Sequence, residues 1–158
     1  MVALEPPPFV YADEKMKLMK RYPNCFVCGD KNPIGLNVPF YVKDQKVVAE
    51  YTAGRHFEGY KDILHGGILS ALLDEVMIRS VLALGIYALT SEIKVKFKKI
   101  VKIGDKLFLE GRMIEDKGRI LLAEGKITNQ ENEVVAEGEG KFFKAQGEME
   151  KLLAQNLE

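Results

Sequence analysis

The chain has 158 residues, 47% of them hydrophobic and 29% charged, and its 23 basic residues balance its 23 acidic ones. A chain of this length can bury about 70% of its unfolded surface, which predicts one domain with a sizeable core. The neutral balance excludes a general nucleic-acid binder. No uncharged apolar stretch reaches 18 residues, so we expect no membrane span. Without a basic-then-apolar leader pattern, we expect a soluble, cytoplasmic protein.

The first 24 residues predict an extension in front of the domain. Three consecutive prolines at 6–8 favour a stiff, extended segment. Asp13 is a candidate N-cap for a short helix that runs through Tyr22 and ends before Pro23. We expect this extension to pack on the domain surface. Its methionines also suit a lid over a ligand pocket, because Met side chains adapt to varied ligands.

A Cys-x-x-Cys-Gly motif follows, at Cys25 and Cys28. A structural zinc site takes four ligands, and the chain has only two Cys and two His, with neither His at ligand spacing to the cysteines. A redox motif of this kind places its first Cys at a helix start, whereas residues 30–36 are typical of a turn. We therefore expect a structural role for both thiols and no bound metal. Redox chemistry or a metal shared between subunits is the alternative.

Two short strands and a loop come next. Residues 36–41 and 47–52 have strand-like patterns and are joined by a polar turn at 43–45. Residues 55–64 form a loop that carries His56, Glu58 and Gly59. A loop that leads into a buried helix often contributes to function.

Residues 65–85 carry the only long helical pattern of the sequence. Its length predicts a helix of roughly 28 Å, and a helix that is apolar nearly all round is buried on nearly all sides. Glu75 and Arg79 lie four residues apart, so they can pair on one face. Gly67, Ser70 and Asp74 form a narrow stripe of small and polar residues. The apolar positions are Ile68, Leu69, Leu72, Leu73, Val76, Met77, Val81 and Leu84.

The start of this helix and its unpaired acid suggest a site. His65, Gly66 and Gly67 open the helix without a Ser, Thr, Asp or Asn cap. First-turn N–H groups lack intrahelical acceptors, and the helix dipole favours negative charge there, which suits an oxyanion. Asp74 lies two turns along the helix. A buried carboxylate is costly unless it is hydrogen-bonded or useful, so Asp74 is either a core residue bonded to Ser70 or a backbone amide, or a catalytic acid.

The chain after Gly85 reads as β structure. Residues 92–98 alternate between apolar and charged side chains, and further strands are predicted at 107–115, 119–128 and 133–144, separated by polar turns. A long antiparallel meander after one apolar helix predicts an α+β fold, with a sheet wrapped around that central helix. We expect the domain to span 25–145. The tail at 146–158 predicts a short amphipathic helix, exposed or packed on a neighbouring molecule.

These motifs resemble the hotdog-fold thioesterases, in particular the phenylacetyl-CoA thioesterase type. The resemblance rests on His65-Gly66-Gly67 with an acid nine residues after the His, on the strand from Thr90 to Lys99, and on the Gly104-Asp105 turn. It covers about residues 24–144 and implies a hotdog fold. It also implies hydrolysis of an acyl-CoA thioester to a carboxylate and free CoA, with no separate cofactor.

The resemblance assigns roles to residues of this chain. Backbone N–H groups of Gly66 or Gly67, next to His65, would hold the oxyanion. Asp74 would act as general base on water or as nucleophile through an anhydride, and Thr90 would orient the carboxylate or the water. In the family the glycines come from one subunit and the acid from the other, which implies a homodimer or homotetramer.

The chain departs from the family pattern at one position. Six residues before the motif His the family often carries Asn, which helps to place the attacking water, and here that position is Gly59. Water placement would then fall to His56 or Glu58. His56 also resembles the His of the hotdog dehydratases, but those enzymes need a Glu where this chain has Ser70, so dehydration ranks third. The second reading is a non-catalytic hotdog module that binds acyl-CoA.

A lysine-rich strand is the last candidate for substrate contact. Lys96, Lys98 and Lys99 would meet the phosphates of CoA, although such alternation is also typical of the solvated face of a sheet. We take these three lysines, with His56, Gly59 and Ser70, as candidate substrate-binding residues. Self-association and acyl-CoA are the expected partners, with no nucleic acid and no membrane.

Overall fold

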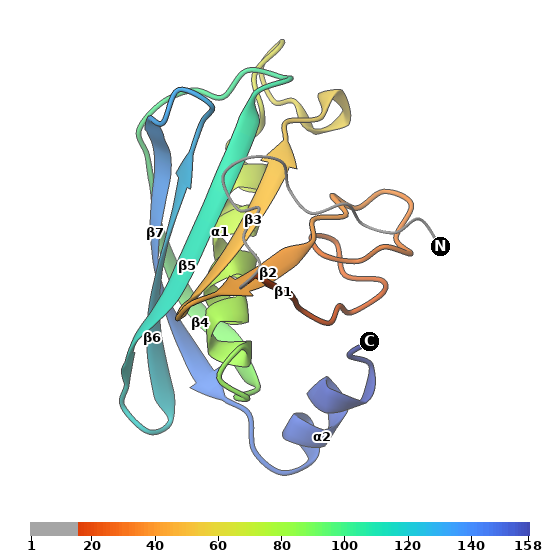
Figure 1. Ribbon diagram of the computed structural model, residues 1–158, viewed down its shortest axis with the longest axis vertical. Coiled ribbons are helices and arrows are strands. Elements are labelled where there is room, and N and C mark those ends of the chain that lie inside the picture. Colours follow the sequence, from red (N-terminus) through yellow and green to blue (C-terminus); the bar gives the residue numbers. More distant parts are fainter. Residues whose placement is uncertain (1–15) are drawn as a thin grey trace.

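A computed structural model of the protein describes residues 16–158, which form one antiparallel sheet, one long helix and two short helices (Figure 1). The sheet has seven strands in the order β1-β2-β3-β5-β6-β7-β4. The elements are β1 (Lys17–Leu18), β2 (Phe40–Lys43), β3 (Lys46–Thr52), η1 (Arg55–Phe57), α1 (Gly66–Leu82), β4 (Ala88–Phe97), β5 (Lys106–Asp116), β6 (Ile120–Thr128), β7 (Val134–Lys144) and α2 (Glu148–Gln155). The predicted α+β architecture, a sheet wrapped around a central helix, is confirmed.

A row of glycines lets α1 approach the sheet closely. Gly111, Gly125 and Gly138 are register partners across β5, β6 and β7. A Cβ atom on Gly111 would lie 2.4 Å from the carbonyl oxygen of Val76, and one on Gly125 would lie 3.2 Å from side-chain carbons of α1. Side chains at these positions would hold the helix away from the sheet, so the glycines allow the sheet to curve around it.

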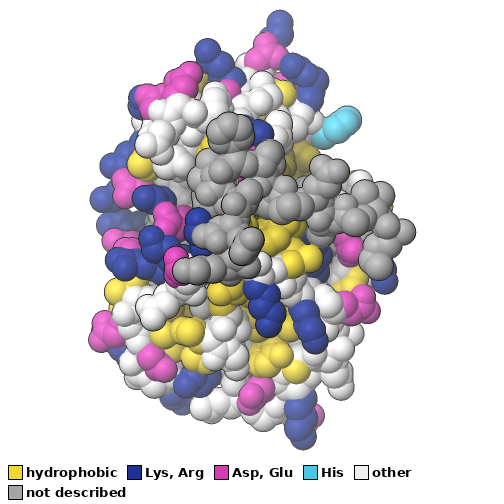
Figure 2. All heavy atoms as spheres, in the orientation of Figure 1, with side chains coloured by type: hydrophobic (Ala, Val, Ile, Leu, Met, Phe, Trp, Pro, Cys, Tyr) yellow, Lys and Arg dark blue, Asp and Glu magenta, His cyan; other side chains and the backbone are white. Residues whose placement is uncertain are grey.

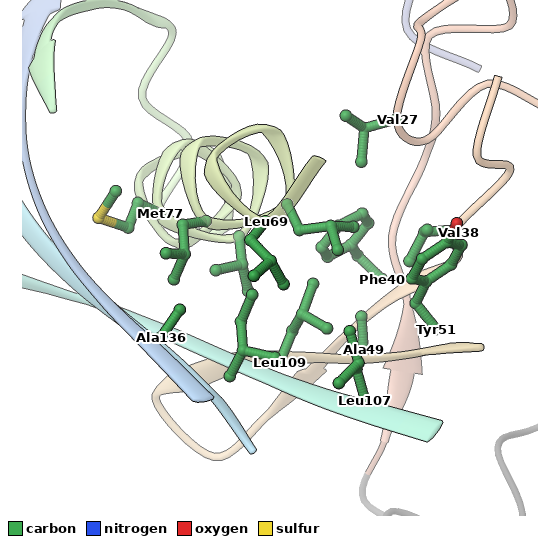
Figure 3. Packing of buried hydrophobic residues seen from close by; sticks show 14 of the residues in the cluster. Val27, Val38, Phe40, Ala49, Tyr51, Leu69, Met77, Leu107, Leu109 and Ala136 are labelled. Atoms are coloured by element: carbon green, nitrogen blue, oxygen red, sulfur yellow. The ribbon is translucent and has the colours of Figure 1, made fainter. Parts of the chain in front are cut away.

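The core lies between α1 and the concave face of the sheet. Figure 3 shows Leu69 and Met77 extending from α1 toward Leu109 and Ala136 of the sheet. The helix is less completely buried than its sequence predicts, because Asp74 and its neighbours along one side are only half-buried. The helical pattern also overruns the helix itself, which ends at Leu82.

The segment before β2 differs from its prediction. The short helix expected to end at Tyr22 is not present in the described part of the chain, where Lys17–Leu18 instead pair with β2. Asp13, its expected cap, lies outside the described residues. The strand predicted at 36–41 begins only at Phe40, because the N–H groups of Leu36 and Val38 donate to the carbonyls of Phe26 and Val27 in the cysteine turn.

The C-terminal tail forms its helix, α2, as the amphipathic pattern of residues 146–158 predicts. Its end packs on its own chain: Arg21 and Glu158 exchange two backbone hydrogen bonds, and the Tyr22 hydroxyl donates to the Leu153 carbonyl over 2.5 Å. The tail therefore packs against the segment that directly precedes the two cysteines.

Charge is balanced locally as well as over the chain. Figure 2 shows basic and acidic side chains intermixed along the side of the molecule formed by β5, β6 and β7. Cross-strand pairs such as Arg112–Glu124 and Lys126–Glu110 account for this pattern. No helix in the described residues is long and apolar enough to cross a bilayer.

Candidate functional site

The loop before α1 is fixed by the Gly-Asp turn. Gly104 has a φ of +95°, which favours glycine, and its N–H donates to the Ala53 carbonyl. Asp105 accepts from the Lys102 N–H over 2.9 Å, and Ile63 pairs with Lys102. The turn thus holds residues 62–64 beside residues 101–103 and so sets the position at which α1 begins.

His65 is the N-cap of α1, for which the sequence offers no Ser, Thr, Asp or Asn cap. Its Nδ1 accepts the N–H of Gly67 at 2.8 Å, so a neutral His65 ring carries its proton on Nε2. Gly67 is therefore not open as an oxyanion donor while the ring holds this position. Among residues 16–158, the Gly66 N–H has no hydrogen-bond partner, and Gly66 becomes the better of the two predicted donors.

The surroundings of Gly66 include one side chain that the sequence analysis missed. A Cβ on Gly66 would lie 3.4 Å from the Phe97 ring, so this half-exposed aromatic ring lies beside the free N–H. The alternation of residues 92–98 predicts that Phe97 shares a face of the strand with other apolar residues, but it does not show which turn of α1 the ring meets. Phe97 is the apolar wall nearest to the helix start.

The two predicted loop positions differ in their contacts. Gly59 packs on His65: a Cβ at residue 59 would lie 3.2 Å from His65 Cδ2 and 3.3 Å from its Cα. Gly59 is therefore near the helix start, as its candidate role requires, and it leaves room for the imidazole. His56 is exposed in η1, where no described contact joins it to His65.

Asp74 and Thr90 form the centre of the candidate site. The Thr90 hydroxyl donates to Asp74 Oδ1 over 2.8 Å. Partial burial raises the pKa of Asp74 above its usual 3.8, the Thr90 hydrogen bond opposes this rise, and the charge of Glu75 adds to it. A half-buried carboxylate with a raised pKa and one fixed hydrogen bond is a stronger proton acceptor than an exposed carboxylate.

Ser70 is not the partner of Asp74. Its hydroxyl donates to the Gly66 carbonyl over 3.2 Å, four residues back along the helix. The expectation that Asp74 might bond to Ser70 or to a backbone amide is therefore wrong, since Thr90 supplies the contact. Ser70 borders the helix start through this bond.

Lys98 and Lys99 follow the end of β4 at Phe97, whereas Lys96 lies within β4, on the face of the sheet away from α1. Lys96 lines a shallow cavity there together with acidic and basic residues of β5–β7. Lys98 pairs with Glu137 over 3.4 Å, and Lys99 pairs with Glu133. Within one chain, Lys98 and Lys99 thus neutralise carboxylates, and no described contact joins any of the three lysines to Asp74.

A second cluster joins the cysteine turn to α1. Arg79, only 2% exposed, donates through Nε to Glu75 Oε1 over 2.9 Å, as the spacing predicts, and its NH2 group lies 2.7 Å from Cys28 Sγ. Cys25 Sγ lies 3.9 Å from Glu75 Oε2. A hydrogen bond from the Cys28 thiol lowers the pKa of Cys25 to about 6, and the same interaction raises the pKa of Cys28.

Comparison with known proteins agrees with this architecture. A family model described as the thioesterase superfamily matches residues 61–136, the stretch that holds α1, the Asp74–Thr90 pair and the Gly-Asp turn. Over these 76 residues, just under half of its length, the chain is similar to the thioesterase superfamily. Its sheet and helix form the hotdog fold that the sequence motifs predict.

Individual relatives extend the likeness. Mouse acyl-coenzyme A thioesterase THEM5 is 30% identical over 80 residues, which are 49% of this chain and 32% of THEM5, so the chain spans about a third of that relative. A hypothetical thioesterase from Streptococcus pneumoniae, solved with coenzyme A, is 25% identical with a TM-score of 0.63, over 65% of this chain and 83% of its own. The Escherichia coli PaaI protein, from the phenylacetic acid degradation operon, is 21% identical with a TM-score of 0.66, over 71% and 82%.

Two more structures of the pneumococcal protein concern the same pair of residue types. They are alanine variants of an aspartate and of a threonine that follows it by sixteen residues. The same sixteen residues separate Asp74 from Thr90.

Proposed function

We propose that the protein hydrolyses acyl-CoA thioesters. One observation carries this proposal: a half-buried carboxylate, Asp74, has a raised pKa and a 2.8 Å hydrogen bond from Thr90. It lies on the same helix that begins with Gly66, whose N–H has no hydrogen-bond partner among the described residues. A positioned base and a backbone oxyanion donor are the two parts that acyl transfer to water requires.

The reaction follows from these parts. The thioester carbonyl oxygen accepts from the Gly66 N–H at the positive end of the helix dipole, which stabilises the negative charge that develops on it. Asp74 takes a proton from water as the water oxygen attacks the carbonyl carbon. The carbon–sulfur bond then breaks, and the CoA thiolate leaves and is protonated. In the alternative route, the Asp74 carboxylate attacks the carbonyl carbon itself, and the carbon–sulfur bond breaks as the CoA thiolate leaves. Water then hydrolyses the resulting anhydride to the carboxylic acid and the free Asp74 carboxylate.

The two parts cannot serve one carbonyl within a single chain. Gly66 and Asp74 are eight residues apart on α1, which separates them by about 12 Å along the helix axis, whereas both must approach the same reacting group to about 3 Å. A second copy of the chain would supply the missing half. β4 lies at the edge of the sheet with Leu89 and Phe97 exposed beside it, a suitable surface for such a partner. We therefore propose a homodimer, or a tetramer of such dimers, with sites shared between subunits.

The substrate class is supported by the relatives. THEM5 is named an acyl-coenzyme A thioesterase, and the pneumococcal neighbour was solved with coenzyme A. The finer proposal is a phenylacetyl-CoA thioesterase type, supported by the His65-Gly66-Gly67 motif with its acid nine residues after the His. Gly59 has no side chain to place water, so ordering of the water would rest on Asp74 and Thr90.

The first experiment measures thiol release from a panel of acyl-CoA thioesters, aliphatic and aromatic. We expect turnover with at least one member and none in the absence of protein. Binding of acyl-CoA without thiol release across the panel would favour the non-catalytic module instead.

The second experiment tests the shared site with two variants. Gly66→Pro removes the proposed oxyanion donor at the first helical position, where Pro is well tolerated. His65 already has the extended backbone (φ −61°, ψ 134°) that a residue before Pro requires. We expect a loss of about 10²–10³ in kcat, whereas Gly66→Ala, which retains the N–H, should keep most of the turnover.

Mixing Gly66→Pro chains with Asp74→Asn chains then separates the two arrangements. If each site takes its glycine from one chain and its acid from the other, half of the randomly formed dimers are mixed, and each mixed dimer has one intact site. The mixture should recover about a quarter of wild-type activity. Activity no higher than that of the separate variants would refute the shared site, as would a fully active monomer in light scattering.

A further inference from the structure

The cysteine turn is shaped to present two sulfur atoms to one point. The Cys28 N–H donates to Cys25 Sγ over 3.4 Å, and the Gly29 N–H donates to the Cys25 carbonyl over 3.0 Å. Only glycine fits at position 29, because a Cβ there would lie 2.4 Å from the Pro23 carbonyl oxygen. The backbone therefore folds tightly around the first sulfur, and the second sulfur faces the same side.

Helix α1 supplies a carboxylate to this point. The oxygen and sulfur atoms of Cys25, Cys28 and Glu75 that can bind a metal all lie within 4.8 Å of one another. Glu75 points Oε1 at Arg79 and turns Oε2 toward Cys25 Sγ at 3.9 Å. The Arg79 contact thus holds the carboxylate in a fixed orientation with one oxygen left for a ligand.

We propose that Cys25, Cys28 and Glu75 bind a thiophilic divalent cation, Zn²⁺ in the first place. Zn–S distances of about 2.3 Å and Zn–O distances of about 2.0 Å in a tetrahedron place the sulfur and oxygen about 3.5 Å apart. The Cys25–Glu75 distance of 3.9 Å is within a few tenths of an ångström of that value. The other pairs of ligand atoms lie within 4.8 Å, so binding a cation requires any sulfur–oxygen pair to close by at most about 1.3 Å.

The charges of the cluster suit this occupant. Two thiolates and one carboxylate around Zn²⁺ leave one negative charge, and the Arg79 guanidinium, in contact with both Cys28 Sγ and Glu75, neutralises it. Arg79 thereby acts as the outer contact that orients two of the ligands. The fourth position belongs to water, because Cys25 and Glu75 also line a cavity of about 250 Å³ between α1 and the C-terminal tail.

The test uses the full chain, reduced and stripped with a chelator, and titrated with Zn²⁺ and with Co²⁺. We expect one ion per chain, a near-ultraviolet sulfur-to-cobalt charge-transfer band, visible bands typical of tetrahedral Co²⁺, and a Tm that rises with the logarithm of free Zn²⁺. These readouts are independent of thioester hydrolysis, so the proposed activity and the proposed metal site can fail separately.

Two variants and a control locate the site. Cys25→Ser should abolish the charge-transfer band from that sulfur and weaken Zn²⁺ binding at least tenfold, and Glu75→Gln should weaken it about tenfold or more. Glu58→Gln, a change at an exposed carboxylate in the loop before α1, should bind as wild type does. Absence of the charge-transfer band in wild-type protein, or equal Zn²⁺ affinity in wild type, Cys25→Ser and Glu75→Gln, would overturn the proposal.

Discussion

Replacing Asp74 by Asn should abolish turnover and leave the fold intact. The amide keeps the size of the side chain and an oxygen that can accept from Thr90, but it loses the charge and the basicity. Loss of a positioned general base costs about 10² or more in kcat, which is about 2.7 kcal/mol of transition-state stabilisation. A thiol-release assay at saturating acyl-CoA measures this loss directly.

Stability should change in the opposite direction. The pKa of Asp74 is higher in the folded than in the unfolded chain, so its contribution to stability is greatest below pH 3.8 and is lost as pH rises through the folded-state pKa. At pH 7 the ionised Asp74 carboxylate therefore lowers the free energy of unfolding, and the neutral amide of the Asn variant does not. We expect the Tm of Asp74→Asn to equal or exceed that of wild type at pH 7, with the difference falling to zero at acid pH.

The neighbouring carboxylate provides the contrast. Glu75 pairs with the nearly fully buried Arg79, so Glu75→Gln should lower the free energy of unfolding by about 1–3 kcal/mol while turnover per folded molecule stays within about a few-fold. A destabilised Asp74→Asn protein with intact turnover would refute the assignment. A loss of turnover in Glu75→Gln as large as in Asp74→Asn would show that the wrong carboxylate was chosen.

Two further predictions concern the contacts around Asp74 and the sheet. Thr90→Val removes the hydrogen bond that lowers the pKa of Asp74, so the acidic limb of the pH–kcat profile should move to higher pH, and an unmoved limb would exclude Asp74 as the titrating base. Gly111→Ala should destabilise the fold by more than 2 kcal/mol in denaturant titration, about the cost of a forced overpacking, because its Cβ would lie 2.4 Å from the Val76 carbonyl. A Cβ on Gly138 would meet the flexible end of the Met77 side chain at 3.3 Å and two Leu73 carbons at an ordinary 3.5 Å, so Gly138→Ala should cost less. Equal losses would contradict the close approach of α1 at Gly111.

The sequence by itself determined the order of the helix and the main strands, and it also determined one contact within the helix. The apolar pattern of residues 65–85 is long enough to predict α1, and the alternation after Gly85 predicts β4–β7, because a helix and a strand repeat their side chains with different periods. The pairing of Glu75 with Arg79 also followed from spacing, since residues four apart share a helix face. The motif spacing was sufficient to select Asp74 as the candidate acid.

Only the tertiary structure decided which groups meet. The His65 ring accepts the hydrogen bond of the Gly67 N–H. The ring can take this position because Gly59, which has no side chain, leaves room for it beside the helix start. The proposed metal site depends on Glu75, which lies 47 residues beyond Cys28. No metal-binding sequence motif built on cysteine or histidine spacing would include this residue. Contacts between residues far apart in sequence depend on how the chain folds back on itself, and neither composition nor periodicity contains that information.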